Sequence, residues 1–267
     1  MSDVTKRILT GAAYVTLLLF VMMQPISALV LFLLVAILAT LELKKIFEKQ
    51  NLDFHTWPAI IIGLTSYLAI IYSEIKFILF LEIIIYFISL LFQTRKNTLL
   101  LAGGTLFCVI YIFIPLSLVI PIGCFENEIY NYKVLFGLLI LIWSSDSWAF
   151  VCGKLFGRHK LFERISPNKT WEGFIGSIIL TVLTGYILSL NGFELSSIQW
   201  MVLGALTAVT ATLGDLFQSM LKRESNIKDS GKILPGHGGI LDRFDSILLC
   251  FPTFYLYLNY INPILNY

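Results

Sequence analysis

The chain of 267 residues is 57% hydrophobic and only 13% charged. Soluble globular domains carry about 25% charged residues, and one compact domain of this length cannot bury so many helix-length apolar runs, so the composition argues against a soluble protein. The formal net charge of +2 is too small to indicate a nucleic-acid partner.

Mostly apolar stretches of about 20 residues, each long enough to cross a bilayer as a helix, follow one another along the chain. They predict an all-α, polytopic integral membrane protein with about nine transmembrane helices in a single membrane domain. The first stretch follows Lys6 and Arg7 like a secretory signal, but it lacks a convincing small-residue cleavage site, so we expect it to be retained. The predicted spans are residues 8–23, 26–43, 58–73, 77–93, 98–121, 134–152, 173–190, 200–217 and 246–262.

Basic residues are distributed unevenly over the predicted loops. If the N-terminus is cytoplasmic, all but two of the 19 lysines and arginines, Lys76 and Lys133, fall on the cytoplasmic side. This asymmetry is typical of a protein of the cell membrane that obeys the positive-inside rule. The two long polar connections, 153–172 and 218–245, are both cytoplasmic in this topology, and we expect the functional site there. The helices of 134–262 would then be catalytic, and residues 1–130 would serve as scaffold or as dimer or lipid contacts.

Several polar residues lie in or near the first of these connections. Asp146 falls inside a predicted span among serines, which indicates an inward-facing polar pocket. Ser166 and Pro167 predict a helix N-cap with proline in the first turn. The free amide groups of that turn, beside Lys169, would offer an anion site, although an ordinary capped helix start would use the same residues.

Acidic and basic residues alternate through the second connection. If the preceding span continues as a helix, Asp215, Ser219 and Lys222 share one face, with Arg223 adjoining. Because Asp215 lies at the end of an apolar span, its charge requires a cation partner.

A glycine-rich run, Pro235-Gly236-His237-Gly238-Gly239, lies further along the same connection. Its glycines can adopt positive φ and expose backbone N–H groups, which allows a chain to wrap a phosphate. A tight re-entry turn would use the same glycines, with His237 as a solvated loop residue.

Two carboxylates, Asp242 and Asp245, stand three residues apart at the start of the last span and would share one helical face. Two helix ends bearing carboxylates, at Asp215 and at Asp242, could share a metal, and oxygen-only ligands favour Mg²⁺. Alternatively, these acids cap helices or pair with neighbouring bases such as Arg243, and the bases form a patch for lipid headgroups.

The residues from Ser219 to Asp245 resemble the signature of the phosphatidate cytidylyltransferases, the CDP-diglyceride synthases. The pattern is Ser-x-apolar-Lys-Arg, four residues, Lys-Asp-x-small, and then Pro-x-His-Gly-Gly-apolar-x-Asp-Arg-apolar-Asp, and every fixed position is present. One departure is Phe150, where many members have tyrosine. The resemblance implies an all-helical membrane fold, a homodimer, and a divalent metal held by Asp215 and Asp242. Upstream residues that also look like this family are Asp146, Ala149, Gly153, Phe156, Gly157, Ser166, Pro167, Lys169, Thr170, Glu172 and Gly173.

The resemblance implies a step of phospholipid biosynthesis, in which CTP and phosphatidic acid give CDP-diacylglycerol and pyrophosphate. We expect Mg²⁺, alone or with a second cation, to bridge phosphate oxygens of CTP. The cations Lys222, Arg223 and Arg243 would neutralise charge on the pyrophosphate, and Asp245 would be a second metal ligand or orient Arg243. The residues expected to bind CTP or the lipid phosphate are Asp146, Ser166, Lys169, Ser219, Lys228, Asp229, Gly236, His237, Gly238, Gly239 and Asp245.

Two other functions are compatible with parts of the pattern. A CTP-dependent lipid kinase acting on a polyprenol or phytol would move the γ-phosphoryl group instead of the cytidylyl group. A membrane transporter would use Asp146, Asp215 and Asp242 as an ion path, but it would need polar residues throughout the depth of the bilayer, and here they crowd at one face.

Overall fold

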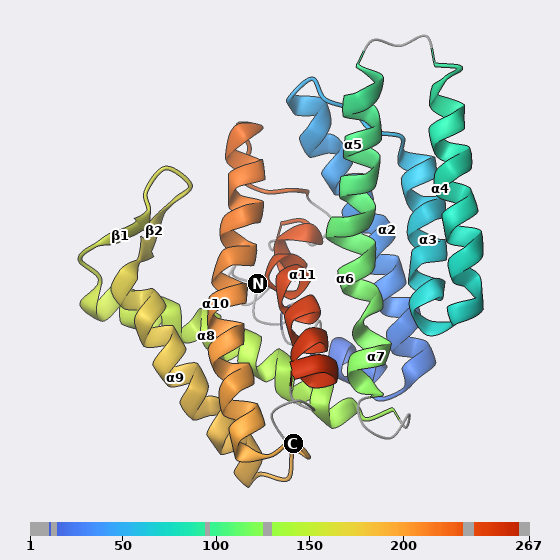
Figure 1. Cartoon of the computed structure of the whole chain (residues 1–267). Coiled ribbons are helices and arrows are strands. Elements are labelled where there is room, and N and C mark those ends of the chain that lie inside the picture. Colours follow the sequence, from blue (N-terminus) through green and yellow to red (C-terminus); the bar gives the residue numbers. More distant parts are fainter. Residues whose placement is uncertain (1–10, 12–14, 94–96, 125–129, 232–237, 262–267) are drawn as a thin grey trace, which may run out of the picture. The chain divides into compact units, whose positions relative to one another are not determined.

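The protein is described by a computed structural model that covers residues 11, 15–93, 97–124, 130–231 and 238–261. The described residues are mostly helical, which confirms the prediction of an all-α membrane-type fold (Figure 1). The exception is one two-stranded antiparallel sheet. The chain divides into two compact units, one formed by residues 1–121 with 224–244 and the other by residues 122–223 with 245–267.

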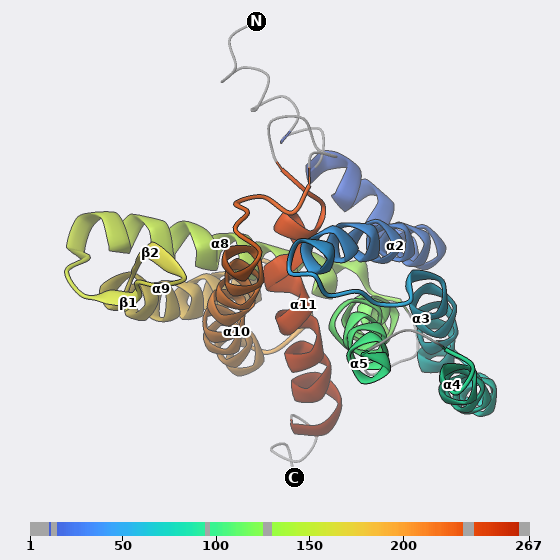
Figure 2. The ribbon, with the colours of Figure 1, turned by 90° about the horizontal axis from the view of Figure 1, so that it is seen from above.

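The first unit is built from helices that follow one another along the chain. Helix α2 begins at Pro25, and proline suits this place because the first N–H groups of a helix have no partner within the helix. After the helix ends, Asn51 adopts a left-handed φ of 56°. Helices α3 and α4 lie side by side in both ribbon views (Figures 1 and 2). The elements are a helical stretch at 15–22, α2 (Pro25–Lys49), α3 (Thr56–Ile71), a 3₁₀ turn (Ser73–Ile75), α4 (Lys76–Leu90), α5 (Thr98–Cys108), a π-helical turn (Val109–Phe113), α6 (Ile114–Ser117) and α7 (Val119–Gly123), which ends in the second unit.

A buried hydrogen-bond network joins three helices of the first unit. The Tyr86 hydroxyl of α4 donates to Thr105 Oγ1 of α5 at 2.9 Å and lies 3.2 Å from Nδ1 of His55, the residue before α3. The backbone N–H of His55 donates to the same Thr105 oxygen at 3.0 Å. Polar side chains that meet inside a helical membrane protein satisfy one another in this way, so the network fixes how α3, α4 and α5 pack.

The second unit contains the remaining helices and the sheet. Helices α8 and α9 pack along each other, and the β1–β2 hairpin joins their ends (Figure 1). A glycine permits this close packing, because a Cβ atom on Gly173 would lie 2.7 Å from the carbonyl oxygen of Ala149. The elements are α8 (Tyr132–Phe156), β1 (Lys160–Phe162), β2 (Ser166–Thr170), α9 (Trp171–Leu190), α10 (Ser197–Glu224), α11 (Leu241–Leu256), which begins in the first unit, and a π-helical turn (Tyr257–Ile261).

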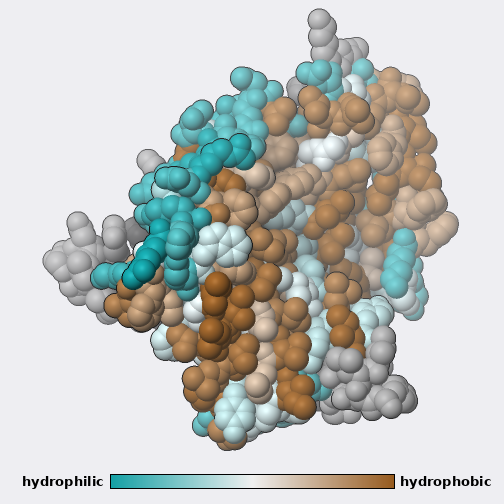
Figure 3. Space-filling model, turned by 60° about the vertical axis from the view of Figure 1, so that its left-hand side comes forward, coloured by the Kyte–Doolittle hydropathy of each residue, from teal (hydrophilic) through white to brown (hydrophobic). Residues whose placement is uncertain are grey.

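Among the residues that the structure describes, five helical stretches are long and apolar enough to cross a membrane, and α3 is a shorter apolar helix. The protein is therefore an integral membrane protein, while the number of nine spans stays a prediction. Helix α9 carries a stripe of exposed apolar side chains, among them Ile175, Ile179 and Leu183, as expected for contact with lipid. On the face that Figure 3 brings forward, hydrophilic side chains form a cluster and hydrophobic side chains cover much of the surface. The five candidate spans are Pro25–Lys49, Thr98–Gly123, Tyr132–Phe156, Trp171–Leu190 and Ser197–Glu224.

The start of α9 differs from the prediction. Ser166 and Pro167 do not cap a helix, because they lie in strand β2, where Ser166 pairs with Phe162 of β1. The N-cap is Thr170, whose Oγ1 accepts a hydrogen bond from the backbone N–H of Gly173 at 3.2 Å. Because Ser166 pairs in the sheet, the helix starts only after Thr170, and Thr170 supplies the cap.

Candidate active site

A salt bridge lies at the centre of the polar cluster in the second unit. Lys169 Nζ, from strand β2, lies 2.6 Å from Asp215 Oδ2 of helix α10, and both side chains are about one-quarter to one-third exposed, at 25% and 34%. Ser219, one turn later on α10, is positioned to donate to Asp215 Oδ1 at 3.5 Å. The predicted helical face of Asp215 and Ser219 is therefore confirmed. Lys169, which contacts Asp215, comes from the first polar connection, 153–172.

Two more carboxylates surround this pair. Asp146 of α8 interacts electrostatically with Lys169 and Asp215, and Asp245 of α11 interacts with Asp215, Asp146 and Lys222. Three carboxylates from three helices thus repel one another, and two lysines offset part of that repulsion. Asp146 is exposed in the structure although it lies within a candidate span, and the polar pocket expected around it stays a prediction. An arrangement of this kind attracts a further cation.

Close backbone packing holds the α10 and α11 carboxylates in place. A Cβ atom on Gly214 would lie 2.6 Å from the carbonyl oxygen of Asp245, so the two helices touch where Asp215 and Asp245 emerge. The Asp245 side chain is fixed by the backbone N–H of Ser246, which donates to its Oδ1 at 2.8 Å. At the end of α10, Arg223 Nε donates to the carbonyl oxygen of Ile165 at 3.4 Å, which ties the helix to the loop between β1 and β2.

The hairpin that carries Lys169 is fastened at its base by Glu172. The Glu172 carboxylate accepts hydrogen bonds from the backbone N–H groups of Arg158, at 3.0 Å, and of His159, at 3.2 Å. His159 Nδ1 lies 2.6 Å from Glu172 Oε1. The acidic residue in the first turn of α9 therefore holds the chain that leads into β1, and with it the strand that positions Lys169.

A second cluster of carboxylates lies in the first unit. Asp242 Oδ2 accepts hydrogen bonds from the backbone N–H groups of Ser230, at 2.8 Å, and Gly239, at 3.1 Å. Gly238 has a φ of +86°, so the expected positive φ in the glycine run is confirmed at that position. The N–H of Gly239 is directed at Asp242, whereas the sequence pattern suggested a phosphate as its partner.

The sequence pattern did not point to Glu42, which belongs to the same cluster. The side chain of Glu42 is 0% exposed on α2, and its carboxylate accepts hydrogen bonds from Ser230 Oγ, Ile240 N and Leu241 N. An acidic residue within an apolar run indicates a paired or functional side chain, and Asp146 is a candidate site residue for this reason. The signal is weak here because Glu42 stands at the end of a predicted span, where charged residues are ordinary.

The predicted site residues fall into both units. Asp215 belongs to one unit and Asp242 to the other, so their sharing of one metal stays a prediction from the sequence. Gly236 and His237 lie outside the described residues. The second unit holds Asp146, Ser166, Lys169, Asp215, Ser219, Lys222, Arg223 and Asp245, and the first unit holds Lys228, Asp229, Gly238, Gly239, Asp242 and Arg243.

The acidic groups of both clusters have the chemistry that Mg²⁺ requires. Within the residues that the structure describes, no three or more Asp, Glu, His or Cys side chains form a complete metal-binding group. Mg²⁺ in phosphoryl-transfer sites usually takes one or two carboxylates and completes its shell with water and substrate phosphates. Asp215 and Asp245 offer carboxylate oxygens of the type that such an ion takes, and magnesium binding stays a prediction.

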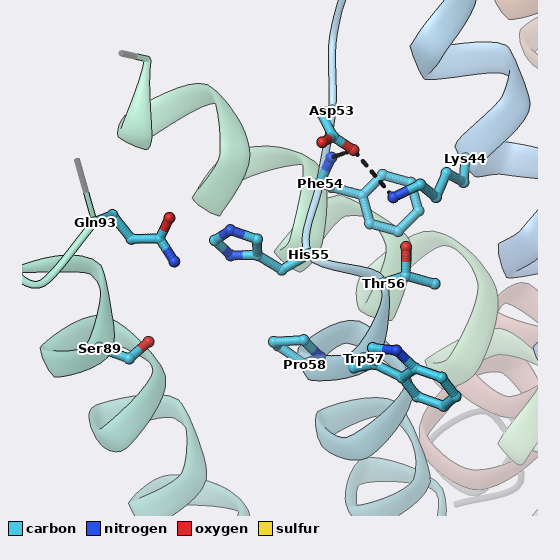
Figure 4. A pocket seen from close by; sticks show the side chains of 9 residues that line it. All are labelled: Lys44, Asp53, Phe54, His55, Thr56, Trp57, Pro58, Ser89 and Gln93. Carbon is cyan, nitrogen blue, oxygen red and sulfur yellow. Dashed lines mark hydrogen bonds and ion pairs between the residues drawn. The ribbon is translucent and has the colours of Figure 1, made fainter. Parts of the chain in front are cut away.

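A separate hollow of about 360 Å³ lies in the first unit, lined by residues at the end of α2, the start of α3 and the end of α4 (Figure 4). Its charged groups are paired with each other, because Asp53 Oδ1 accepts hydrogen bonds from Lys44 Nζ, at 3.3 Å, and from the N–H of Phe54, at 2.8 Å. None of the predicted site residues lines it, so it is distinct from both carboxylate clusters.

Comparison with known proteins finds relatives over most of the chain. The model of the cytidylyltransferase family matches residues 5–261. A phosphatidate cytidylyltransferase of Bacillus subtilis is 34% identical over 97% of this chain and 98% of its own length. A phosphatidate cytidylyltransferase of Rickettsia bellii is 36% identical over 80% of this chain and 94% of its own length. One of Staphylococcus epidermidis is 30% identical over 92% of this chain and 96% of its own length. The similarity extends from the first predicted span to the last, and the chain belongs to the cytidylyltransferase family.

Proposed function

We propose that this protein is a phosphatidate cytidylyltransferase, which joins the cytidylyl group of CTP to phosphatidic acid and releases pyrophosphate. The observation that carries the proposal is the similarity, over nearly the whole chain, to proteins named for this activity. A membrane enzyme suits the reaction, because phosphatidic acid is held in the bilayer and CTP is dissolved in water.

In the reaction, a phosphate oxygen of phosphatidic acid forms a bond to the α-phosphorus of CTP. The bond between that phosphorus and the oxygen bridging to the β-phosphorus breaks, and pyrophosphate leaves with the electron pair. The attacking phosphate is already an anion at neutral pH, so the enzyme needs no strong general base. The protein must instead bring two anions together and neutralise the charge on the leaving group.

The basic side chains are suited to this task. Lys169 and Lys222 lie among the carboxylates of the second unit, and Arg223 is held near them by the hairpin. We assign Lys222, Arg223 and Arg243 to the pyrophosphate and Lys169 to the lipid phosphate or to CTP. We propose Mg²⁺ as the cofactor, with Asp215 and Asp242 as ligands and Asp245 as a further candidate. The ion would offset the negative charge of the nucleotide phosphates.

The positive-inside distribution supports a cytoplasmic N-terminus and a site at the cytoplasmic face of the cell membrane, where CTP is available. The family resemblance also implies a homodimer, which light scattering on the detergent-purified protein would test.

The decisive experiment uses purified protein in liposomes with CTP labelled on either its α- or its γ-phosphate. Label from the α-position should enter a chloroform-soluble product only when phosphatidic acid and Mg²⁺ are both present. Label from the γ-position should remain in the aqueous phase as pyrophosphate. Transfer of the γ-label to a lipid would identify a lipid kinase instead, and protein that binds CTP but labels no lipid would overturn the proposal.

A further inference from the structure

Helix α2 carries a fully buried carboxylate, Glu42, whose role the reaction described above does not explain. A buried charge is costly unless hydrogen bonds satisfy it. Both oxygens of Glu42 are satisfied, since Oε1 accepts from the N–H of Ile240 at 3.0 Å, and Oε2 accepts from the N–H of Leu241 at 2.9 Å and from Ser230 Oγ at 2.7 Å. All three partners donate, so both oxygens of the Glu42 carboxylate serve as hydrogen-bond acceptors.

The two backbone donors stand at the beginning of helix α11, which starts at Leu241. The first N–H groups of a helix have no partner within the helix, and the helix dipole adds partial positive charge there. Glu42 supplies the missing acceptor from another helix. It therefore fixes the N-terminus of α11, one residue before Asp242.

Glu42 and Asp242 bind the same short backbone segments. Ser230 donates its hydroxyl to Glu42 and its N–H to Asp242 at 2.8 Å. The consecutive N–H groups of residues 239–241 are divided in the same way, with Gly239 directed at Asp242 and the next two at Glu42. The position of the Asp242 carboxylate is therefore coupled to that of Glu42 through shared donors.

Steric limits explain why glycine stands at positions 231 and 239 of the signature. A Cβ atom on Gly231 would overlap the Glu42 carboxylate, and one on Gly239 would overlap both that carboxylate and Ser230 Oγ. Only glycine allows the backbone to approach the buried carboxylate this closely.

The same face of α2 holds other parts of the 224–244 segment. One turn after Glu42, the carbonyl oxygen of Ile46 accepts from Ser225 Oγ at 3.1 Å, and another turn on, Gln50 Nε2 donates to the same hydroxyl at 2.9 Å. Near the start of the helix, the ring of Phe32 packs edge-on against Phe244, with centroids 5.9 Å apart. Helix α2 thus contacts residues 224–244 at several places, and Glu42 provides a charged contact among them.

We propose that Glu42 is a positioning residue for cytidylyl transfer, which holds the first turn of α11 so that the Asp242 carboxylate keeps the orientation that the reaction uses. The inference rests on the proposed function. Glu42 touches neither substrate nor metal in this role and acts through Asp242 and the backbone of residues 239–241.

The test is Glu42→Gln, which keeps the side chain's shape but turns one acceptor oxygen into an N–H₂ group facing a backbone donor. We expect kcat to fall by about 10- to 100-fold, as for loss of a hydrogen bond to a charged group, with KM for phosphatidic acid nearly unchanged. The Mg²⁺ concentration for half-maximal activity should rise, which a loss of folded protein alone would not cause. The matched control is Glu48→Gln, an exposed glutamate of the same helix, which should behave as wild type.

A second variant covers the case in which Glu42→Gln does not fold. Ser230→Ala removes only the hydroxyl that links the two carboxylates, and it should lower kcat several-fold with a smaller rise in the Mg²⁺ requirement. In the double variant the two effects should be less than additive, because both changes act on one contact. Folded Glu42→Gln with wild-type kcat and Mg²⁺ dependence would overturn the proposal, as would an unchanged Ser230→Ala where Glu42→Gln is unfolded. Failure of the proposed function would look different, because the wild-type protein itself would label no lipid.

Discussion

Lys169 Nζ lies 2.6 Å from Asp215 Oδ2, so a residue of strand β2 neutralises a carboxylate of helix α10. The lysine also lies 3.4 Å from the carbonyl oxygen of Thr212, three residues earlier on the same helix. The hairpin is therefore anchored on helix α10, which carries the predicted metal ligand Asp215.

Replacing the lysine of this pair should impair activity strongly. Lys169→Met removes one of the two lysines that offset the charge of Asp215, Asp146 and Asp245, and we expect kcat/KM to fall by about 100-fold, the effect of about 2.7 kcal/mol. Lys169→Arg keeps the charge and should lose less. Lys154→Met removes a lysine from the last turn of α8 and serves as the control. Wild-type rates for Lys169→Met would show that the salt bridge has no part in the reaction.

The two predicted metal ligands should be tested together. Asp215→Asn and Asp242→Asn should each lower kcat by at least about 100-fold, as expected when a charged metal ligand is lost. If both bind one ion, the double variant should be little worse than either single variant. Asp53→Asn, which alters a carboxylate already paired with Lys44, should stay within about twofold of wild type. Additive losses for Asp215 and Asp242 would argue for separate roles.

Close packing of α8 and α9 predicts a clear effect on stability. In Gly173→Ala the new methyl group would meet the carbonyl oxygen of Ala149 at 2.7 Å and the Cα of Gly153 at 3.1 Å. Overpacking of this kind costs about 1–3 kcal/mol, so thermal unfolding in detergent should occur at a lower temperature. Gly103→Ala is the matched control, because a Cβ atom there has no neighbour within 4 Å. Equal unfolding temperatures for the two variants would contradict the tight helix contact.

The start of α9 can be verified by removing its cap. Thr170→Ala deletes the acceptor for the N–H of Gly173, and the free energy of unfolding should fall by about 1 kcal/mol. Thr170→Ser keeps the acceptor and should be close to wild type. Ser166→Ala should leave stability nearly unchanged, since Ser166 lies in β2 and caps no helix. The opposite order of stabilities would restore Ser166 as the N-cap.

The proposed orientation predicts which residues can be labelled from each side of the membrane. Arg164, in the β1–β2 loop, and Glu194, between α9 and α10, are both exposed. In intact cells, Glu194→Cys should react with a membrane-impermeant maleimide, whereas Arg164→Cys should react only after the membrane is opened. The wild-type protein provides the background from its own cysteines. Reaction of Arg164→Cys in intact cells would reverse the proposed topology.

Much of the fold follows from hydropathy, which is a local property of the sequence. The apolar runs predicted at 26–43, 134–152 and 200–217 lie within α2, α8 and α10, because in lipid a chain satisfies its backbone hydrogen bonds by forming a helix. Helical spacing also placed Ser219 on the face of Asp215 correctly. The signature between Ser219 and Asp245 is sufficient to indicate the family, because it consists of residue types at fixed spacing.

Tertiary structure decided which distant residues meet. Glu42 and Leu241 are 199 positions apart, and no periodicity in the sequence links an acid in one helix to the first N–H groups of another. Asp215 likewise forms a salt bridge with Lys169, a residue of a strand that precedes α9, and no local pattern in the sequence links the two. The predicted N-cap at Ser166 lies in a strand instead, because Ser166 pairs with Phe162 of β1. Sequence alone thus determined the helices and the family, since these depend on local composition and pattern, and the fold determined the partner of each charge, since partners depend on where the chain brings its segments together.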